Sequence, residues 1–288
     1  MVSFTAPRRA GMRSSRNLYI SSQEYGYMIE FYDNDMSTCA QKVRLVLAAK
    51  GLKYQRHYLD IRAGETQTPE YLKLNPNGVV PTIVDNGEVI IESAVIIAYL
   101  DDAYPTPSLS PDNAIARADM LRWIIRPDAG LHQACGETSF ALAFRHQISC
   151  LPEATQQKLF SKMPSEKRRN EIHAIVEHGL YAPGIGLAIR TYYKAIYDMQ
   201  IQLSNTKWIA DSKWTLADAT LLPYVLRLDH LGLSWFWDDK PLVANWYQEA
   251  ISRPEFSVIT DYMNEDYLSL MAAVTQAEHA RVKQILGE

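Results

Sequence analysis

The stretch NPNGVVPTIVDNGEVIIES, residues 75–93, decides how the first part of the chain folds. Its Asn86-Gly87 pair lies between the apolar runs 82–85 and 88–91, and Asn-Gly between two such runs is the strongest short-range signal for a β-hairpin. Ser93 then begins an apolar stretch that continues to about Tyr104 and that we predict to be a helix. The stretch therefore predicts a hairpin followed at once by a helix.

Toward the amino terminus, the residues before this hairpin predict a β-α-β unit. Residues 29–32 form a short apolar strand, and Ser37–Lys50 predicts a helix that ends before Gly51, where a C-cap glycine belongs. Residues 54–59 predict a second strand, and a short helix is expected near residues 70–74. The expected order over residues 28–104 is β-α-β-α-β-β-α, which is an α/β domain.

The chain changes character after Tyr104. Pro105, Pro107 and Pro111 predict a stiff linker over residues 105–113, and the rest has helical periodicity, so we expect an all-helical domain over residues 114–288. Pro127 should kink a long helix over 114–149. Residues 152–186 are interpreted as a polar insertion. Further helices are expected over 187–203, from a capping-box-like Thr215–Asp218 to Leu233, and near 242–252 and 261–286.

Composition limits the classes of function. The chain has 288 residues, of which 47% are hydrophobic and 22% charged, so a packed core is expected. A net charge of −4 gives no reason to expect a nucleic-acid partner, and no apolar run approaches the roughly 20 residues of a membrane helix. The three cysteines, Cys39, Cys135 and Cys150, do not form a disulfide framework and favour a reducing, cytoplasmic location. Residues 1–27 are expected to be a disordered or variable extension, an upstream start or a targeting segment.

The first segment that suggests chemistry is STCAQKVR, which begins at Ser37 where a strand turns into a helix. A helix N-terminus presents unpaired N–H groups and a partial positive charge, which stabilise an anion such as a thiolate. A hydroxyl there can donate a hydrogen bond to a bound thiolate. The alternative is that Ser37 is only the N-cap of the helix.

Two further segments suggest a ligand with peptide character. Val80-Pro81 is a candidate cis peptide, whose backbone could pair with an extended peptide; the alternative is an ordinary trans proline. Glu92-Ser93 begins a helix, so its N–H groups could bind a carboxylate while Glu92 pairs with an ammonium group. A helix cap is again the alternative.

The stretches STCAQKVRL, NPNGVVPTIVDNGEVIIES and AVIIAYLD resemble the N-terminal domain of glutathione transferases. The resemblance covers roughly residues 28–265 and implies a thioredoxin-like domain with a mixed four-stranded sheet, followed by the all-helical domain. It implies glutathione as co-substrate, with Ser37 as the thiol-activating residue and Val80, Pro81, Glu92 and Ser93 as its binding residues.

With serine at position 37, the chain resembles the serine-type branches of that family, and the bacterial branch related to β-etherases is one candidate. Cys39 follows Ser37 by two residues, as in zeta-like members, and is either a helper of the catalytic serine or a small core residue. Val79 departs from the polar residue that many members carry two positions before the proline. No Cys-x-x-Cys occurs, which disfavours dithiol redox chemistry.

The expected function is transfer of glutathione to a hydrophobic electrophile, in detoxification, ether cleavage or dehalogenation. Two alternatives remain: a non-catalytic protein of this fold used for binding or assembly, and a glutathione-dependent thiol reductase acting through Cys39. We expect a homodimer, by resemblance, and no metal site. Candidates for the electrophile pocket are Trp123, His132, Glu137, Phe140, His146, Tyr224, Arg227 and His230.

Overall fold

The computed structural model describes residues 28–161 and 165–287, so the extension predicted over residues 1–27 lies outside the described residues. The first part of the chain forms β1 (Ile29–Asp33), α1 (Thr38–Ala49), β2 (Tyr54–Tyr58), α2 (Pro69–Leu74), β3 (Thr82–Asp85), β4 (Glu88–Ile91) and α3 (Ser93–Ala103). This is the predicted order of elements. The four strands form one sheet in the order β2-β1-β3-β4, in which β1 is parallel to β2 and antiparallel to β3.

The hairpin between β3 and β4 forms where the sequence predicts it. Asn86 and Gly87 have φ values of 53° and 86°, and two consecutive positive values match the turn that suits the twist of paired strands. In the sheet, Ile83 of β3 lies opposite Phe31 of β1 on one side and Ile90 of β4 on the other. Phe31 and Ile83 are fully buried, so this alignment places the apolar face of the sheet in the core.

The second part of the chain is helical, as predicted. Its helices are α4 (Ala114–Ile124), α5 (His132–Ser139), α6 (Arg145–Ser149), α7 (Glu153–Ser161), α8 (Glu166–His178), α9 (Ile185–Gln202), α10 (Leu216–His230), α11 (Pro241–Ile251), α12 (Ser257–Thr260), α13 (Glu265–Ala272) and α14 (Gln276–Leu286). The capping box at the start of α10 is present, because an Asp218 carboxylate oxygen accepts from both the N–H and the hydroxyl of Thr215.

The long helix predicted over residues 114–149 is interrupted more strongly than one kink. A π-helical turn over Pro127–Leu131 separates α4 from α5, and Gly130 within it has a φ of 121°. Proline lacks the N–H that would continue the helix, and glycine adopts this positive φ at low cost. The chain therefore changes direction directly before His132. A second π-helical turn, Phe140–Phe144, separates α5 from α6.

The segment interpreted as a polar insertion contains two helices that the sequence analysis did not predict individually. It forms α7 and α8, and the buried side chains of Phe160, Ile172 and Val176 make a small cluster that packs against Phe140. The helical pattern of these apolar residues is weak in the sequence, because the charged residues 167–169 lie among them. The stretch 261–286 is likewise two helices, α13 and α14, because Thr275 caps a new helix with Glu278.

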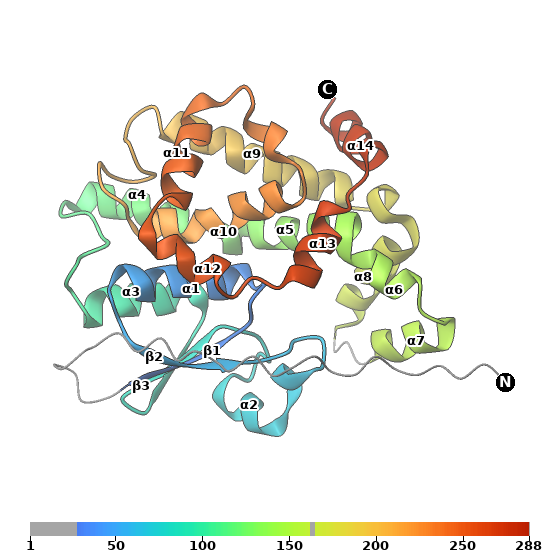
Figure 1. Cartoon of the computed structure of the whole chain (residues 1–288), viewed down its shortest axis with the longest axis horizontal. Helices are drawn as coiled ribbons and strands as arrows, with labels where there is room; N and C mark the ends of the chain where they lie inside the picture. Colours follow the sequence, from blue (N-terminus) through green and yellow to red (C-terminus); the bar gives the residue numbers. More distant parts are fainter. Residues whose placement is uncertain (1–27, 162–164, 288) are drawn as a thin grey trace.

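Helix α1 lies between the sheet and the helical part of the molecule (Figure 1) and contacts α3 and α10. Arg44 of α1 is fully buried and forms an ion pair with Asp33, 3.2 Å away, at the end of β1. Its guanidinium also donates to the main-chain oxygens of Asn34 and Asp35, and to that of Val258 in α12. These contacts fix the loop that leads into the first turn of α1.

Candidate functional site

The first turn of α1 begins at Ser37. Ser37 is the N-cap, and its Oγ accepts a hydrogen bond from the N–H of Ala40 at 3.3 Å. Ser37 therefore caps the helix, as one of the two interpretations of the sequence proposed. An accepting hydroxyl still has its own proton to donate, so a role toward a bound thiolate stays a prediction.

A buried hydrogen bond joins α1 to the first residue of α3. Lys42 donates from Nζ to Ser93 Oγ at 3.0 Å, and Lys42 is fully buried. Desolvation lowers the pKa of the Lys42 ammonium, while nearby acidic groups, Cys39 first among them, oppose that shift. The Lys42 ammonium group therefore lies at the first residue of α3, and an ammonium group next to the N–H groups of a helix N-terminus suits an anion.

Glu92, which precedes α3, has an unusual backbone. Its φ is 68° and its ψ is 112°, in a region that costs a non-glycine residue about 1–3 kcal/mol. Its exposed carboxylate accepts a hydrogen bond from Asn77 Nδ2 at 3.2 Å. Such backbone strain clusters at ligand sites. The Val80–Pro81 peptide bond is cis, and the sequence alone could not decide between the cis and trans forms.

Cys39 lies in the first turn of α1 and contacts two side chains of the helical part. Its Sγ is 3.7 Å from Nδ1 of His132 in α5 and 3.8 Å from the hydroxyl of Tyr224 in α10. His132 Nδ1 and the Tyr224 hydroxyl are 3.1 Å apart, so the three groups contact one another. Cys39 is partly exposed, His132 is exposed and Tyr224 is buried.

The electrostatics of this cluster favour a thiolate. Burial of Cys39 by itself favours the neutral thiol, but the hydrogen bond with His132 and the charges of His132 and Lys42 lower the pKa of Cys39 to about 7. The same hydrogen bond raises the pKa of His132, against the effect of desolvation. Burial raises the pKa of Tyr224 well above its usual value, so Tyr224 keeps its proton and can donate it in a hydrogen bond.

The remaining pocket candidates lie in different surroundings. Arg227 donates to the main-chain oxygen of Met36 at 2.7 Å and to Ser139 Oγ at 3.3 Å. Trp123 is almost wholly buried, and Phe140 packs against the cluster around Phe160. Burial lowers the pKa of His230 to about 4. Of the proposed pocket residues, the structure brings His132 and Tyr224 to Cys39.

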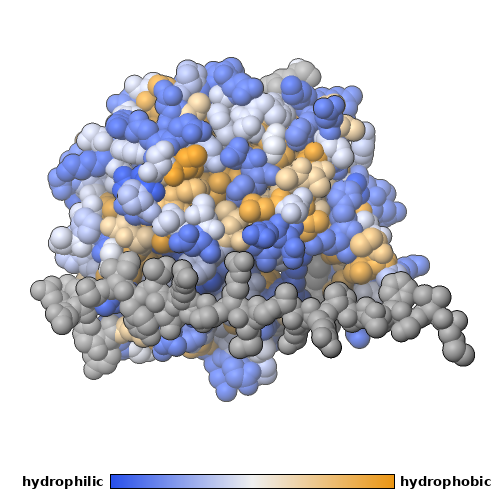
Figure 2. Space-filling model, viewed as in Figure 1, coloured by the Kyte–Doolittle hydropathy of each residue, from blue (hydrophilic) through white to orange (hydrophobic). Residues whose placement is uncertain are grey.

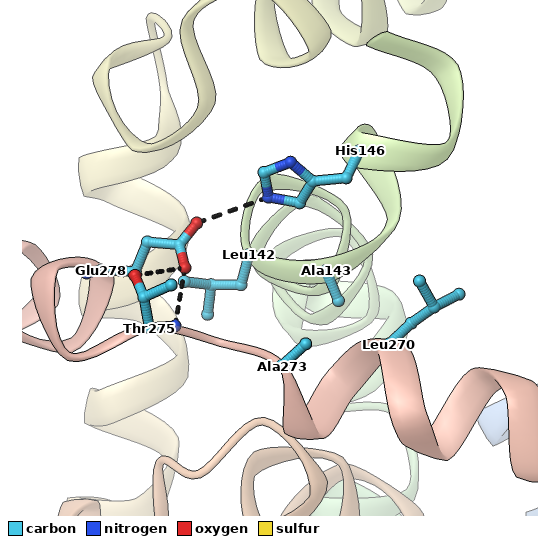
Figure 3. A pocket seen from close by; sticks show the side chains of 7 residues that line it. All are labelled: Leu142, Ala143, His146, Leu270, Ala273, Thr275 and Glu278. Atoms are coloured by element: carbon cyan, nitrogen blue, oxygen red, sulfur yellow. Dashed lines mark hydrogen bonds and ion pairs between the residues drawn. The ribbon is translucent and has the colours of Figure 1, made fainter. Parts of the chain in front are cut away.

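His146 belongs to a separate cavity of about 380 Å³ (Figure 3), together with Leu142, Ala143, Leu270, Ala273, Thr275 and Glu278. His146 Nε2 is 3.6 Å from a carboxylate oxygen of Glu278, whose other oxygen accepts from the N–H and hydroxyl of Thr275. Glu278 thus caps α14, and neither Cys39 nor Ser37 lines this cavity.

Lys42 had no predicted role. Its position three residues after Cys39 places both side chains on one helix face, and this spacing was the signal available in the sequence.

Within residues 28–161 and 165–287 no group of three or more His, Cys, Asp or Glu side chains could hold a metal ion. In the same ranges, none of the helices has the length and apolar character needed to cross a membrane.

Comparison with known proteins agrees with this architecture. Residues 36–103 match the family model for the glutathione S-transferase N-terminal domain, and residues 193–254 match the one for its C-terminal domain. Glutathione S-transferase 1 of Dianthus caryophyllus is 41% identical over 99 residues, which are 34% of this chain and 44% of that protein. The match therefore spans less than half the length of this relative.

Longer matches are weaker in sequence. Glutathione S-transferase F13 of Arabidopsis thaliana is 26% identical over 231 residues, 79% of this chain and 93% of that protein. The crystal structure of β-etherase LigF from Sphingobium sp. strain SYK-6 has a TM-score of 0.71 at 20% identity, covering 82% of this chain and 99% of that one, which shows a common fold. With a mixed four-stranded sheet, a helical second part and a match to both family models, the chain belongs to the glutathione S-transferase superfamily.

Proposed function

We propose that this protein is a glutathione transferase that binds glutathione at the first turns of α1 and α3 and activates its thiol beside Ser37. The observation that carries the proposal is the buried hydrogen bond from Lys42 to Ser93, because it puts an ammonium group next to the N–H groups at the start of α3, which suits an anion. Membership of the superfamily makes glutathione the expected co-substrate.

The γ-glutamyl end of glutathione suits the start of α3. Its α-carboxylate would meet the N–H groups at the start of α3, next to the Lys42 ammonium, and its α-ammonium would pair with the exposed carboxylate of Glu92. The backbone of Val80 would pair with the cysteinyl residue as an added strand does. These contacts would direct the glutathione thiol toward α1.

Ser37 would stabilise the thiolate. Its hydroxyl accepts from the Ala40 N–H, which orients the hydroxyl and leaves its proton free to donate to the sulfur. The partial positive charge of the helix N-terminus adds to this effect. The thiolate then attacks an electrophilic carbon, forming a carbon–sulfur bond and displacing the leaving group with its electron pair.

Titration calorimetry with glutathione and with the dipeptide cysteinylglycine tests the binding mode. Since cysteinylglycine lacks the γ-glutamyl group, we expect it to bind at least about 10-fold more weakly. A panel of aryl halides, epoxides and β-aryl ethers then identifies the reaction. Equal affinity for the two peptides would contradict the proposed site, and binding without any turnover would favour the non-catalytic alternative.

We also propose that the protein forms a cytoplasmic homodimer. Arg126, which follows α4, forms an ion pair with Asp198 of α9. Large apolar side chains are exposed on and next to these helices: Ile115 and Leu121 on α4, Ile125 directly after it, and Leu187, Tyr197 and Ile201 on α9. Apolar surface is also visible between hydrophilic residues in the middle of the face shown in Figure 2. Light scattering of the purified protein measures the oligomeric state.

A further inference from the structure

We propose that Cys39 is a second nucleophile of the same site, which, together with His132 and Tyr224, reduces mixed disulfides between glutathione and other thiols. The inference rests on the proposed function, because glutathione at α1 and α3 supplies both the disulfide to be recognised and the reductant. It assigns a role to His132 and Tyr224 that the transfer of glutathione to an electrophile does not require.

The geometry is that of an activated nucleophile. Cys39 Sγ, the imidazole of His132 and the hydroxyl of Tyr224 come from α1, α5 and α10, and each lies within 3.8 Å of the other two. Nucleophilic catalysis needs a nucleophile within reach of a base that a third group orients. Cys39 is the nucleophile, His132 is the base, and Tyr224 contacts both.

Exposure separates the roles of the two partners. His132 is exposed, so its imidazole can exchange protons with water, while Cys39 is partly exposed and open to a disulfide. Tyr224 is buried, with 1% of its surface exposed, and its main-chain oxygen accepts a hydrogen bond from Tyr192. The Tyr224 side chain is therefore held in the core, with its hydroxyl next to the Cys39 thiol.

Charged and polar groups from several neighbouring elements act on the cluster. Lys42 in α1 and a hydrogen bond with Ser93 at the start of α3 lower the pKa of Cys39. Asp128 in the π-helical turn before α5 raises the pKa of His132, and Cys135 in α5 raises that of Tyr224. Burial opposes ionisation of Cys39, but His132, Lys42 and Ser93 together lower its pKa to about 7. A thiol of this kind is about half ionised at neutral pH.

Cys135 is a thiol of this molecule on whose pKa burial has the largest effect. It is almost wholly buried, and desolvation raises its pKa even though Arg227, Tyr192 and Ser139 act in the other direction. Cys135 is thus a packed side chain of the core. Cys39 differs from it because it is partly exposed, contacts an imidazole and lies in the first turn of a helix.

The reaction balances with glutathione as the only reductant. The Cys39 proton passes to His132, and the thiolate attacks the glutathionyl sulfur of the mixed disulfide. The bond between Cys39 and the glutathionyl sulfur forms, the original S–S bond breaks, and the leaving thiolate takes the proton from His132. A second glutathione thiolate then attacks the glutathionyl sulfur, releases glutathione disulfide and restores the Cys39 thiolate.

The test uses the mixed disulfide of glutathione and 2-mercaptoethanol, with glutathione reductase and NADPH reporting glutathione disulfide. We expect Cys39→Ser to lower this rate at least about 100-fold, and His132→Asn to lower it about 10- to 100-fold. Tyr224→Phe should lower it less, since it removes one hydrogen bond. Cys150→Ser, at an exposed thiol outside the cluster, is the matched control and should leave the rate unchanged.

A trapping experiment tests Cys39 directly. Glutathione disulfide added to the Cys150→Ser protein should place one glutathionyl group on the peptide that contains Cys39, detected by mass spectrometry. The rate of alkylation of Cys39 by iodoacetamide should rise with pH around a midpoint near 7, and His132→Asn should move this midpoint upward. A purely structural role for His132 would leave the midpoint in place.

The outcomes separate this inference from the proposed function. If the wild-type protein conjugates electrophiles but does not reduce the mixed disulfide, or if Cys39→Ser reduces it at the wild-type rate, the inference is wrong and the proposed function stands. If glutathione does not bind in calorimetry, both are wrong. Loss of disulfide reduction in Cys39→Ser, with the Cys150→Ser rate unchanged and glutathione bound in calorimetry by the wild-type protein, supports the inference.

Discussion

Arg227 on α10 donates a hydrogen bond from Nη2 to the main-chain oxygen of Met36 at 2.7 Å, and thereby ties the helical part of the molecule to the residue before Ser37. Arg227 is buried and donates a second hydrogen bond to Ser139. The position of the α1 N-cap therefore depends on a side chain that lies 191 positions further along the chain.

Replacing this arginine should weaken both folding and the site. We expect Arg227→Met to lower the free energy of unfolding by about 2–3 kcal/mol, because hydrogen bonds from a buried charged group are lost and their acceptors stay buried. Affinity for glutathione should fall as well, since the Met36 loop loses its support. Urea unfolding and calorimetry measure the two effects. Arg122→Met, at a surface ion pair with Asp119, is the control and should change stability by less than about 0.5 kcal/mol.

Ser37 and Ser165 provide a matched pair of helix caps. Each accepts a hydrogen bond from the N–H three residues later at 3.3 Å, Ser37 at the start of α1 and Ser165 at the start of α8. Ser37→Ala and Ser165→Ala should each lower the free energy of unfolding by about 1 kcal/mol. Only Ser37→Ala should also lower the rate of conjugation, by about 10-fold or more. Equal conjugation rates in the two variants would show that Ser37 acts solely as a cap.

Glu92 allows backbone strain to be separated from charge. Glu92→Gly should relieve the strain at a φ of 68° and raise the free energy of unfolding, by up to about 2 kcal/mol after the entropy of glycine is subtracted. Glu92→Gln keeps the strain and should leave stability nearly unchanged. Both variants lack the carboxylate, so both should bind glutathione more weakly in calorimetry. A Glu92→Gln protein with full affinity would exclude the proposed pairing with the ammonium group.

His230 should make the protein sensitive to acid. Desolvation lowers its pKa in the folded protein to about 4 from the usual value of 6.5, so the unfolded chain takes up the proton first as the pH falls. The contribution to stability is present above pH 6.5 and is lost as the pH falls from 6.5 toward about 4. Urea midpoints measured over this range should fall less in His230→Gln than in the wild-type protein. Parallel curves for the two proteins would contradict the lowered pKa.

Local signals were enough to predict the sheet domain and the start of α10. The Asn86-Gly87 turn, the C-cap Gly51 and the capping box at Thr215 act through neighbours in the chain, so their effects can be read from short stretches. The helices α7 and α8 were missed because their apolar residues are few and charged residues surround them. The break before His132 was underestimated because Gly130 acts together with Pro127.

The contacts within the site could not be predicted in the same way, because they join residues that are far apart in the chain. Ser37, Val80, Pro81, Glu92 and Ser93 were predicted from a resemblance, and their functional roles remain predictions. The contact of Lys42 with Ser93 spans 51 positions, and that of Cys39 with Tyr224 spans 185. No periodicity or motif specifies such pairs, since they depend on how the helices pack. The lowered pKa of Cys39 therefore could not be inferred before the structure was known.

The Cys39 cluster draws its thiol from one half of the chain and both of its partners from the other. The lowered pKa of Cys39 thus depends on the docking of the two halves, because His132 contributes the first of the effects that lower it. Any condition that separates the two halves should move the pKa of Cys39 toward that of an ordinary cysteine. The speed with which Cys39 reacts with a small alkylating reagent is consequently a chemical gauge of whether the two halves are assembled.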